Sequence, residues 1–213
     1  MVQPIAMDDQ PISATFFGEG KWLTDFITPN ALEVEELHDS ITNGISDIEE
    51  KIAACWSWVA NNVKYKQFIR GKLTIEGKTS YQNDLWNPPS TTARVGVGNC
   101  ANKSFLLASL IRQDLSPDNV FCVLGNLYNG KVGGHAWCMV KLGDREYIVE
   151  STRADIQPLV PTFATERYEA VHYFNDQRTL AVEGKTVLTP MTMCYSQWLT
   201  DYLDYAYLKG RKY

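Results

Sequence analysis

A glycine-broken loop leads into a long apolar segment at residues 98–111, and this junction limits the possible folds more than any other part of the chain. Residues 105–111 are apolar except for one serine, which favours a buried helix. Cys100 then lies in the first turn of that helix. Unpaired backbone N–H groups and the positive end of the helix dipole meet there and stabilise a thiolate. The junction therefore predicts a buried helix with a candidate nucleophile at its N-terminus.

The length and composition are those of a globular protein. The chain has 213 residues, so we expect a single domain over residues 1–213, with residues 1–20 as a loosely packed arm. The net charge of −5 does not favour nucleic acid as a partner. Because no segment contains the roughly 20 apolar residues of a membrane span, we expect no membrane partner either.

The five cysteines are odd in number and irregularly spaced, which argues against disulfides. The N-terminus has neither the charged region nor the apolar region of a signal peptide. We therefore expect a cytoplasmic protein. No two cysteines or histidines are spaced as zinc ligands are, so no metal is expected, and no motif indicates a cofactor.

The first half of the chain shows helical periodicity. A capping box at residues 30–33 predicts one helix, and a second box at residues 46–49 predicts another that ends near residues 61–62. Residues 64–98 contain proline and glycine breaks, so we expect a long connection there rather than regular structure. A terminal helix is predicted over residues 193–208.

The spacing of apolar residues changes after the central apolar helix. Short runs rich in β-branched and aromatic residues predict strands there. The expected strands cover residues 119–125, 135–142, 145–151, 168–174 and 179–182. Helices early in the chain and antiparallel strands later are typical of an α+β domain. We therefore expect N-terminal helices, one of them with the nucleophile at its N-terminus, packed on an antiparallel sheet.

A predicted hairpin brings a histidine and a carboxylate together. Gly143 at the first position of a two-residue turn favours a type II′ hairpin that pairs Leu142 with Arg145. In this register His135 and Glu150 are diagonal neighbours on one face, with Cα atoms about 7–8 Å apart. An imidazole and a carboxylate can span that distance with a hydrogen bond. A slip of one residue would move Glu150 to the opposite face.

These positions suit nucleophilic catalysis. Cys100 would be the nucleophile. His135 would take the proton of the Cys100 thiol and return it to a leaving group. Glu150 would orient the imidazole and stabilise its charged form. The amide N–H of Cys100 would be one oxyanion donor, and the Trp86 indole and the Tyr65 hydroxyl are candidates for the second.

The remaining cysteines and histidines have ordinary structural interpretations. His38 lies on a helix rich in acidic residues and is expected at the surface, whereas His172 lies in an aromatic strand and is expected to be structural. The other cysteines lie in apolar patterns without a partner, so we expect them in the core. These are Cys55, Cys122, Cys138 and Cys194.

Three short motifs follow one another between residues 98 and 152. They are Gly98-Asn99-Cys100, His135-Ala136-Trp137 and Glu150-Ser151-Thr152. With the helix at residues 52–65 and the Trp86-x-Pro88 segment, they resemble the transglutaminase-like superfamily of papain-related thiol enzymes over about residues 46–155. The chain departs from the usual pattern at three places. Asn99 and Glu150 stand where that superfamily more often has aspartate, and Ala101-Asn102 replaces its usual acidic pair after the cysteine.

The resemblance implies a papain-like fold and acyl transfer from an amide through a thioester, with Cys100, His135 and Glu150 as catalytic residues. It leaves the acceptor open. We expect first a cysteine protease-like enzyme that hydrolyses peptide or isopeptide bonds in a peptide or protein substrate. One alternative is a transglutaminase or amide synthase that passes the acyl group to an amine. Another is a binding module that keeps the fold without turnover.

Overall fold

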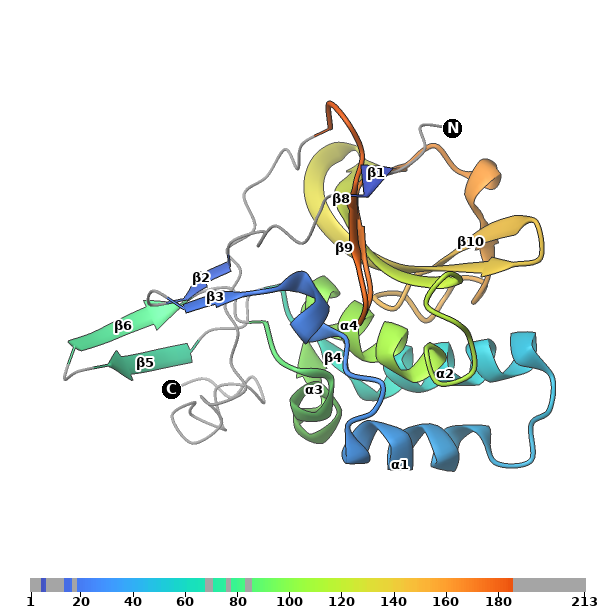
Figure 1. The fold of residues 1–213 in the computed structure, drawn as a ribbon, viewed down its shortest axis with the longest axis horizontal. Helices are drawn as coiled ribbons and strands as arrows, with labels where there is room; N and C mark the ends of the chain where they lie inside the picture. The colour runs from blue at the N-terminus through green and yellow to red at the C-terminus, as the bar shows by residue number, and fades with distance from the viewer. Residues whose placement is uncertain are drawn as a thin grey trace.

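Helices cover one face of a curved antiparallel sheet in the computed structural model of the chain (Figure 1). The predicted α+β class is confirmed. The backbone is described for residues 5–6, 14–16, 19–67, 71–75, 78–82 and 86–185, and side chains for residues 22–67 and 86–185. The predicted terminal helix at residues 193–208 and the side chain of Cys194 lie outside the described residues.

The described α-helices are α1 (Leu32–Thr42), α2 (Ile48–Asn62), α3 (Pro89–Val95) and α4 (Cys100–Ile111). Neither predicted capping box forms. α1 follows Ala31, which gives no side-chain cap, and acidic residues in its first turn favour the helix dipole instead. α2 follows Asp47, whose carboxylate accepts a hydrogen bond from the backbone N–H of Glu50 at 2.9 Å. None of these helices combines the length and apolarity needed to cross a bilayer.

The main sheet of the described residues has seven strands in the order β1-β13-β12-β8-β9-β10-β11, and every neighbouring pair is antiparallel. All five predicted strands are confirmed as members of this sheet. β8 and β9 are longer than predicted because they continue toward each other around Gly130. The strand bounds are β1 (Ile5–Ala6), β8 (Val120–Asn129), β9 (Lys131–Leu142), β10 (Arg145–Val149), β11 (Val160–Pro161), β12 (Tyr168–Phe174) and β13 (Thr179–Ala181).

Residues 64–98 contain more regular structure than predicted, so the expected long connection is wrong. β4 (Lys64–Tyr65) pairs in parallel with β7 (Val97–Gly98), and β5 (Gly71–Ile75) pairs with β6 (Lys78–Gln82). With α3, these pieces are too short to produce a periodic signal in the sequence.

The expected arm at residues 1–20 also contributes strands. β1 pairs with β13 at one edge of the main sheet. β2 (Ala14–Phe16) forms a separate hairpin with β3 (Glu19–Lys21). The rest of this segment lies outside the described residues.

α4 lies between the other helices and the central strands β8 and β9. Each of its residues from Ala101 to Ile111 is buried, which explains why the sequence shows no polar face there. The ring of Phe105 packs against Phe26, Trp86 and Phe174, with centroid distances of 5.1, 4.9 and 5.9 Å. The element that carries Cys100 is therefore surrounded by core on all sides.

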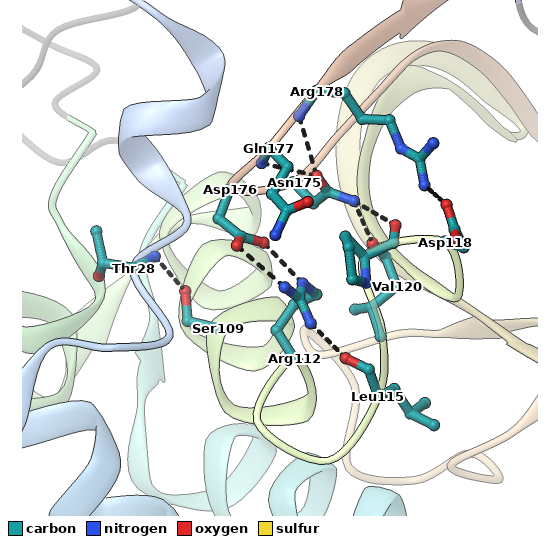
Figure 2. A network of polar contacts seen from close by, with 11 residues as sticks. Thr28, Ser109, Arg112, Leu115, Asp118, Val120, Asn175, Asp176, Gln177 and Arg178 are labelled. Carbon is teal, nitrogen blue, oxygen red and sulfur yellow. Dashed lines mark hydrogen bonds and ion pairs between the residues drawn. The ribbon is translucent and has the colours of Figure 1, made fainter.

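Polar contacts join the far end of α4 to the turn between β12 and β13 (Figure 2). The guanidinium of Arg112 donates to both carboxylate oxygens of Asp176, at 2.7 and 3.0 Å. The side-chain amide of Asn175 donates to the backbone oxygen of Val120 at 3.1 Å. The backbone N–H of Thr28 donates to the Ser109 hydroxyl of α4 at 3.0 Å. The Arg112–Asp176 pair thus joins the end of α4 to the sheet, and the Thr28 contact joins α4 to the segment before α1.

His38 is buried, with 6% of its surface exposed, so the prediction of a surface position is wrong. Its Nε2 lies 2.6 Å from one carboxylate oxygen of Asp114, and Lys51 Nζ lies 2.5 Å from the other. Burial alone would raise the pKa of Asp114, but these two partners hold it below its ordinary value. No local pattern indicates this cluster, because Asp114 follows α4 and lies far along the chain from His38 and Lys51.

Candidate active site

Cys100 is the first residue of α4, which confirms its predicted position. Asn99 caps the helix, because its side-chain oxygen accepts a hydrogen bond from the backbone N–H of Asn102 at 3.0 Å. Gly98 permits the close approach of β7 to this turn, since a Cβ there would lie 2.9 Å from Asn102 Cβ. The thiol is half-buried. The local sequence thus holds a partly accessible sulfur at a helix N-terminus.

The hairpin of β9 and β10 has the predicted register, with Arg145 paired to Leu142. The ladder between these strands ends at Cys138 of β9. β9 continues its pairing with β8 beyond that point, where His135 lies opposite Gly125. Within the described strands, β9 therefore has a neighbour on one side only at His135. His135 therefore lies on the part of β9 that extends beyond the ladder with β10.

His135 interacts with both Cys100 and Glu150. Its Nε2 lies 2.7 Å from Oε2 of Glu150, which confirms the predicted contact. Both residues are buried, since His135 is 8% exposed and Glu150 is 1% exposed. Burial disfavours the charged imidazole, but the side-chain interactions with Cys100 and Glu150 outweigh it and raise the pKa of His135 from 6.5 to about 10. The imidazole of His135 is therefore protonated at neutral pH.

Glu150 is buried yet ionised. Burial alone would raise its pKa, but His135 and two donors from Thr152 hold the pKa below its ordinary value. The backbone N–H and the hydroxyl of Thr152 donate to Oε1 at 2.8 and 2.7 Å. The hydroxyl of Tyr168 donates to Oε2 at 3.0 Å. The Trp56 indole of α2 donates to the backbone oxygen of Glu150 at 2.8 Å, which fixes this end of the hairpin to the helical layer.

Sequence reasoning missed Tyr168 and Trp56. Tyr168 belongs to β12, which is separated from β10 by β8 and β9 in the sheet order. Trp56 lies on α2, and only its apolar spacing is visible in the sequence. No local pattern links either residue to Glu150, so a three-dimensional arrangement was needed to find them.

The two candidates for a second oxyanion donor lie in different surroundings. Trp86 is fully buried, and its ring packs edge-on against Phe26 at 5.2 Å and Phe105 at 4.9 Å. Contact of its indole N–H with a substrate would require this part of the core to open. Tyr65 is 44% exposed and pairs with Gly98, beside the loop that enters α4. Of the two, Tyr65 is the one open to solvent.

The cysteines other than Cys100 that the structure describes are buried and free, which confirms the core prediction for Cys55, Cys122 and Cys138. Burial raises the pKa of Cys55 to about 12 and raises the pKa values of Cys122 and Cys138 as well. His172 is half-buried, and burial lowers its pKa. Among the described residues, no group of three or more His, Cys, Asp or Glu side chains is arranged to hold a metal.

A cavity of about 340 Å³ borders Glu150 and Tyr168. Apolar side chains such as Ile148 and Val160 line it together with the basic residues Arg153 and Arg167. A second cavity of about 290 Å³ shares Ile148 and Tyr168 with the first and is lined by aromatic rings. These rings are Trp137, Phe163 and Tyr173. Space for a bound group therefore adjoins the buried carboxylate.

The fold resembles solved structures of LapG from Legionella pneumophila. One LapG structure has a TM-score of 0.52 and 15% identity, with 71% of this chain and 77% of that chain covered. An EGTA-treated LapG structure has a TM-score of 0.52 and 14% identity, with 70% and 74% covered. At this identity the likeness concerns the fold alone, which is the expected papain-like, transglutaminase-like α+β core. No protein-family model matches the chain, and no curated protein does either.

Proposed function

We propose that this protein is a thiol enzyme of cysteine protease type, which hydrolyses peptide or isopeptide amide bonds through a thioester intermediate. The observation that carries the proposal is that the imidazole of His135 interacts with both Cys100 and Glu150. A nucleophile, a base and an orienting carboxylate in this order are the parts that covalent acyl transfer needs.

In the proposed reaction, the Cys100 thiolate attacks the carbonyl carbon of the scissile amide and forms a tetrahedral intermediate. Glu150 engages Nε2 of His135, so Nδ1 is the nitrogen left to exchange a proton with the reacting groups. That protonated nitrogen donates to the departing amine, and the C–N bond breaks to leave a thioester on Cys100. Neutral His135 then takes a proton from water, whose oxygen attacks the thioester and releases the acid and the thiolate.

The negative oxygen of the tetrahedral intermediate needs hydrogen-bond donors. The backbone N–H of Cys100 at the start of α4 is the first donor in this proposal, since the first N–H groups of a helix have no partner within it. Tyr65 remains a candidate for the second, because its ring is exposed beside the loop that leads to Cys100.

The substrate in this proposal is a peptide or protein, and no cofactor takes part. The cavity beside Glu150 and Tyr168 has a volume that suits a substrate side chain. We also propose a cytoplasmic location, which is consistent with the free thiols of the described cysteines.

The acceptor can be tested with a glutamine-containing peptide and a labelled primary amine, since water and the amine then compete for the same thioester. Mass spectrometry would follow glutamate formation, amine incorporation and the thioester on Cys100. We expect hydrolysis to dominate and Cys100→Ala to abolish both products. Amine incorporation well above hydrolysis would instead support a transglutaminase. Absence of any thioester with a broad peptide panel would favour a binding module.

A further inference from the structure

Tyr168 makes a polar contact that the proposed reaction does not yet use. Its hydroxyl donates to Oε2 of Glu150 at 3.0 Å. The ring is held in place by neighbours, since it meets Trp137 edge-on at 5.1 Å and lies 6.2 Å from the imidazole of His135. The phenol ring is therefore packed beside the direct contact between His135 and Glu150.

The contact completes the hydrogen bonding of a buried carboxylate. Oε2 accepts from His135 and Tyr168, and Oε1 accepts twice from Thr152. Each oxygen thus has two donors, which matches the number of lone pairs it can offer. A carboxylate held in this way cannot rotate without breaking contacts. The orientation of Oε2 toward His135 then depends on Tyr168 as well as on Thr152.

The chemistry of the tyrosine suits a permanent donor. Burial, followed by the negative charge of Glu150, raises the pKa of Tyr168, so its hydroxyl keeps its proton at physiological pH. A hydrogen bond to an ionised group contributes more than one between neutral groups. Glu150 is only 1% exposed. Without the Tyr168 hydroxyl, its Oε2 would have one hydrogen-bond partner fewer.

We infer that Tyr168 is a positioning residue, which acts through Glu150 to hold the imidazolium of His135 and so keeps Cys100 reactive at neutral and mildly acidic pH. This inference rests on the proposed function. It assigns to β12, an element outside the sequence motifs, a part in the reactivity of the thiol on α4.

The test measures the alkylation of Cys100 by iodoacetamide, read by mass spectrometry of the peptide that contains it. Rates are taken at about pH 6, where a free thiol is mostly protonated, and at about pH 10, where a thiol ionises without help. Tyr168→Phe keeps the ring and removes only the hydroxyl. Tyr173→Phe is the matched control, because Tyr173 lies on the same strand and packs on Phe121 at 6.2 Å.

We expect Tyr168→Phe to lower the rate at about pH 6 by about tenfold and to leave the rate at about pH 10 within about twofold of the wild type. Tyr173→Phe should match the wild type at both. In a Glu150→Gln background the further change Tyr168→Phe should have no added effect, since the tyrosine acts through the carboxylate. A purely structural role would lower both rates and would add to Glu150→Gln.

Two results would overturn the inference while leaving the proposed function in place. One is a Tyr168→Phe variant whose Cys100 is alkylated at the wild-type rate at about pH 6. The other is a Tyr168→Phe change that lowers the alkylation rate of Cys100 by the same factor with and without Glu150→Gln. A wild-type Cys100 that reacts no faster than a free thiol at about pH 6 would instead contradict the proposed function itself.

Discussion

At the scale of single residues, His135 and Glu150 each make the charged form of the other favourable in a buried position. The pKa of His135 is raised to about 10, and the pKa of Glu150 is lowered by the imidazolium and by Thr152. Neither charge would be tolerated at this depth alone. The imidazolium should therefore persist across neutral pH and lose its proton only as the pH rises toward about 10.

Glu150→Gln tests this coupling. The amide keeps the size of the side chain but removes the charge, so the pKa of His135 should fall and the alkaline limb of kcat/KM should move to lower pH. Turnover near neutral pH should fall by about 10²–10⁴-fold, as expected when the orienting carboxylate is lost. The pH profile of peptide hydrolysis gives both quantities. An unchanged alkaline limb would show that another group sets the charge of the imidazole.

At the scale of elements, the junction between β7 and α4 positions the thiol of Cys100. The geometry of this junction requires glycine at position 98. Gly98→Ala places a Cβ 2.9 Å from Asn102 Cβ, so the turn must shift. We expect the free energy of unfolding in urea to fall by about 1–3 kcal/mol and Cys100 to lose reactivity. Gly133→Ala is the control, because a Cβ there meets no described atom within 4 Å. Equal stability of both variants would contradict the packing at this junction.

The same scale shows what a sequence can predict. The β9–β10 register followed from one turn glycine and a period of two, so the contact between His135 and Glu150 was predictable. The position of Cys100 followed from the break before an apolar run. Tyr168 was not predictable, because it reaches Glu150 from a strand that is not adjacent to β10. The burial of Trp86 was missed because its loop gives no periodic signal.

At the scale of the whole molecule, the site lies where the helical layer and the sheet meet, so its charges contribute to overall stability. The raised pKa of His135 stabilises the fold fully below its ordinary value of 6.5, and this contribution is lost as the pH rises through about 10. The lowered pKa of Glu150 stabilises the fold above its ordinary value of 4.5, and this contribution is lost as the pH falls.

The stability of the wild type relative to a His135→Gln, Glu150→Gln double variant should therefore be largest between pH 4.5 and 6.5. The difference should shrink toward about pH 10 and also under acid conditions. Urea unfolding across the pH range measures it. A difference that is constant with pH would show that the pair does not titrate as the structure indicates.

The most direct test of the central claim, that Cys100, His135 and Glu150 act together, is the alkylation rate of each cysteine by iodoacetamide at about pH 6. We expect Cys100 of the folded wild type to react much faster than glutathione. Cys55, Cys122 and Cys138 should stay unlabelled, because burial keeps them protonated. His135→Ala should remove the advantage of Cys100. A Cys100 that reacts at the rate of glutathione, or as fast without His135 as with it, would contradict the claim.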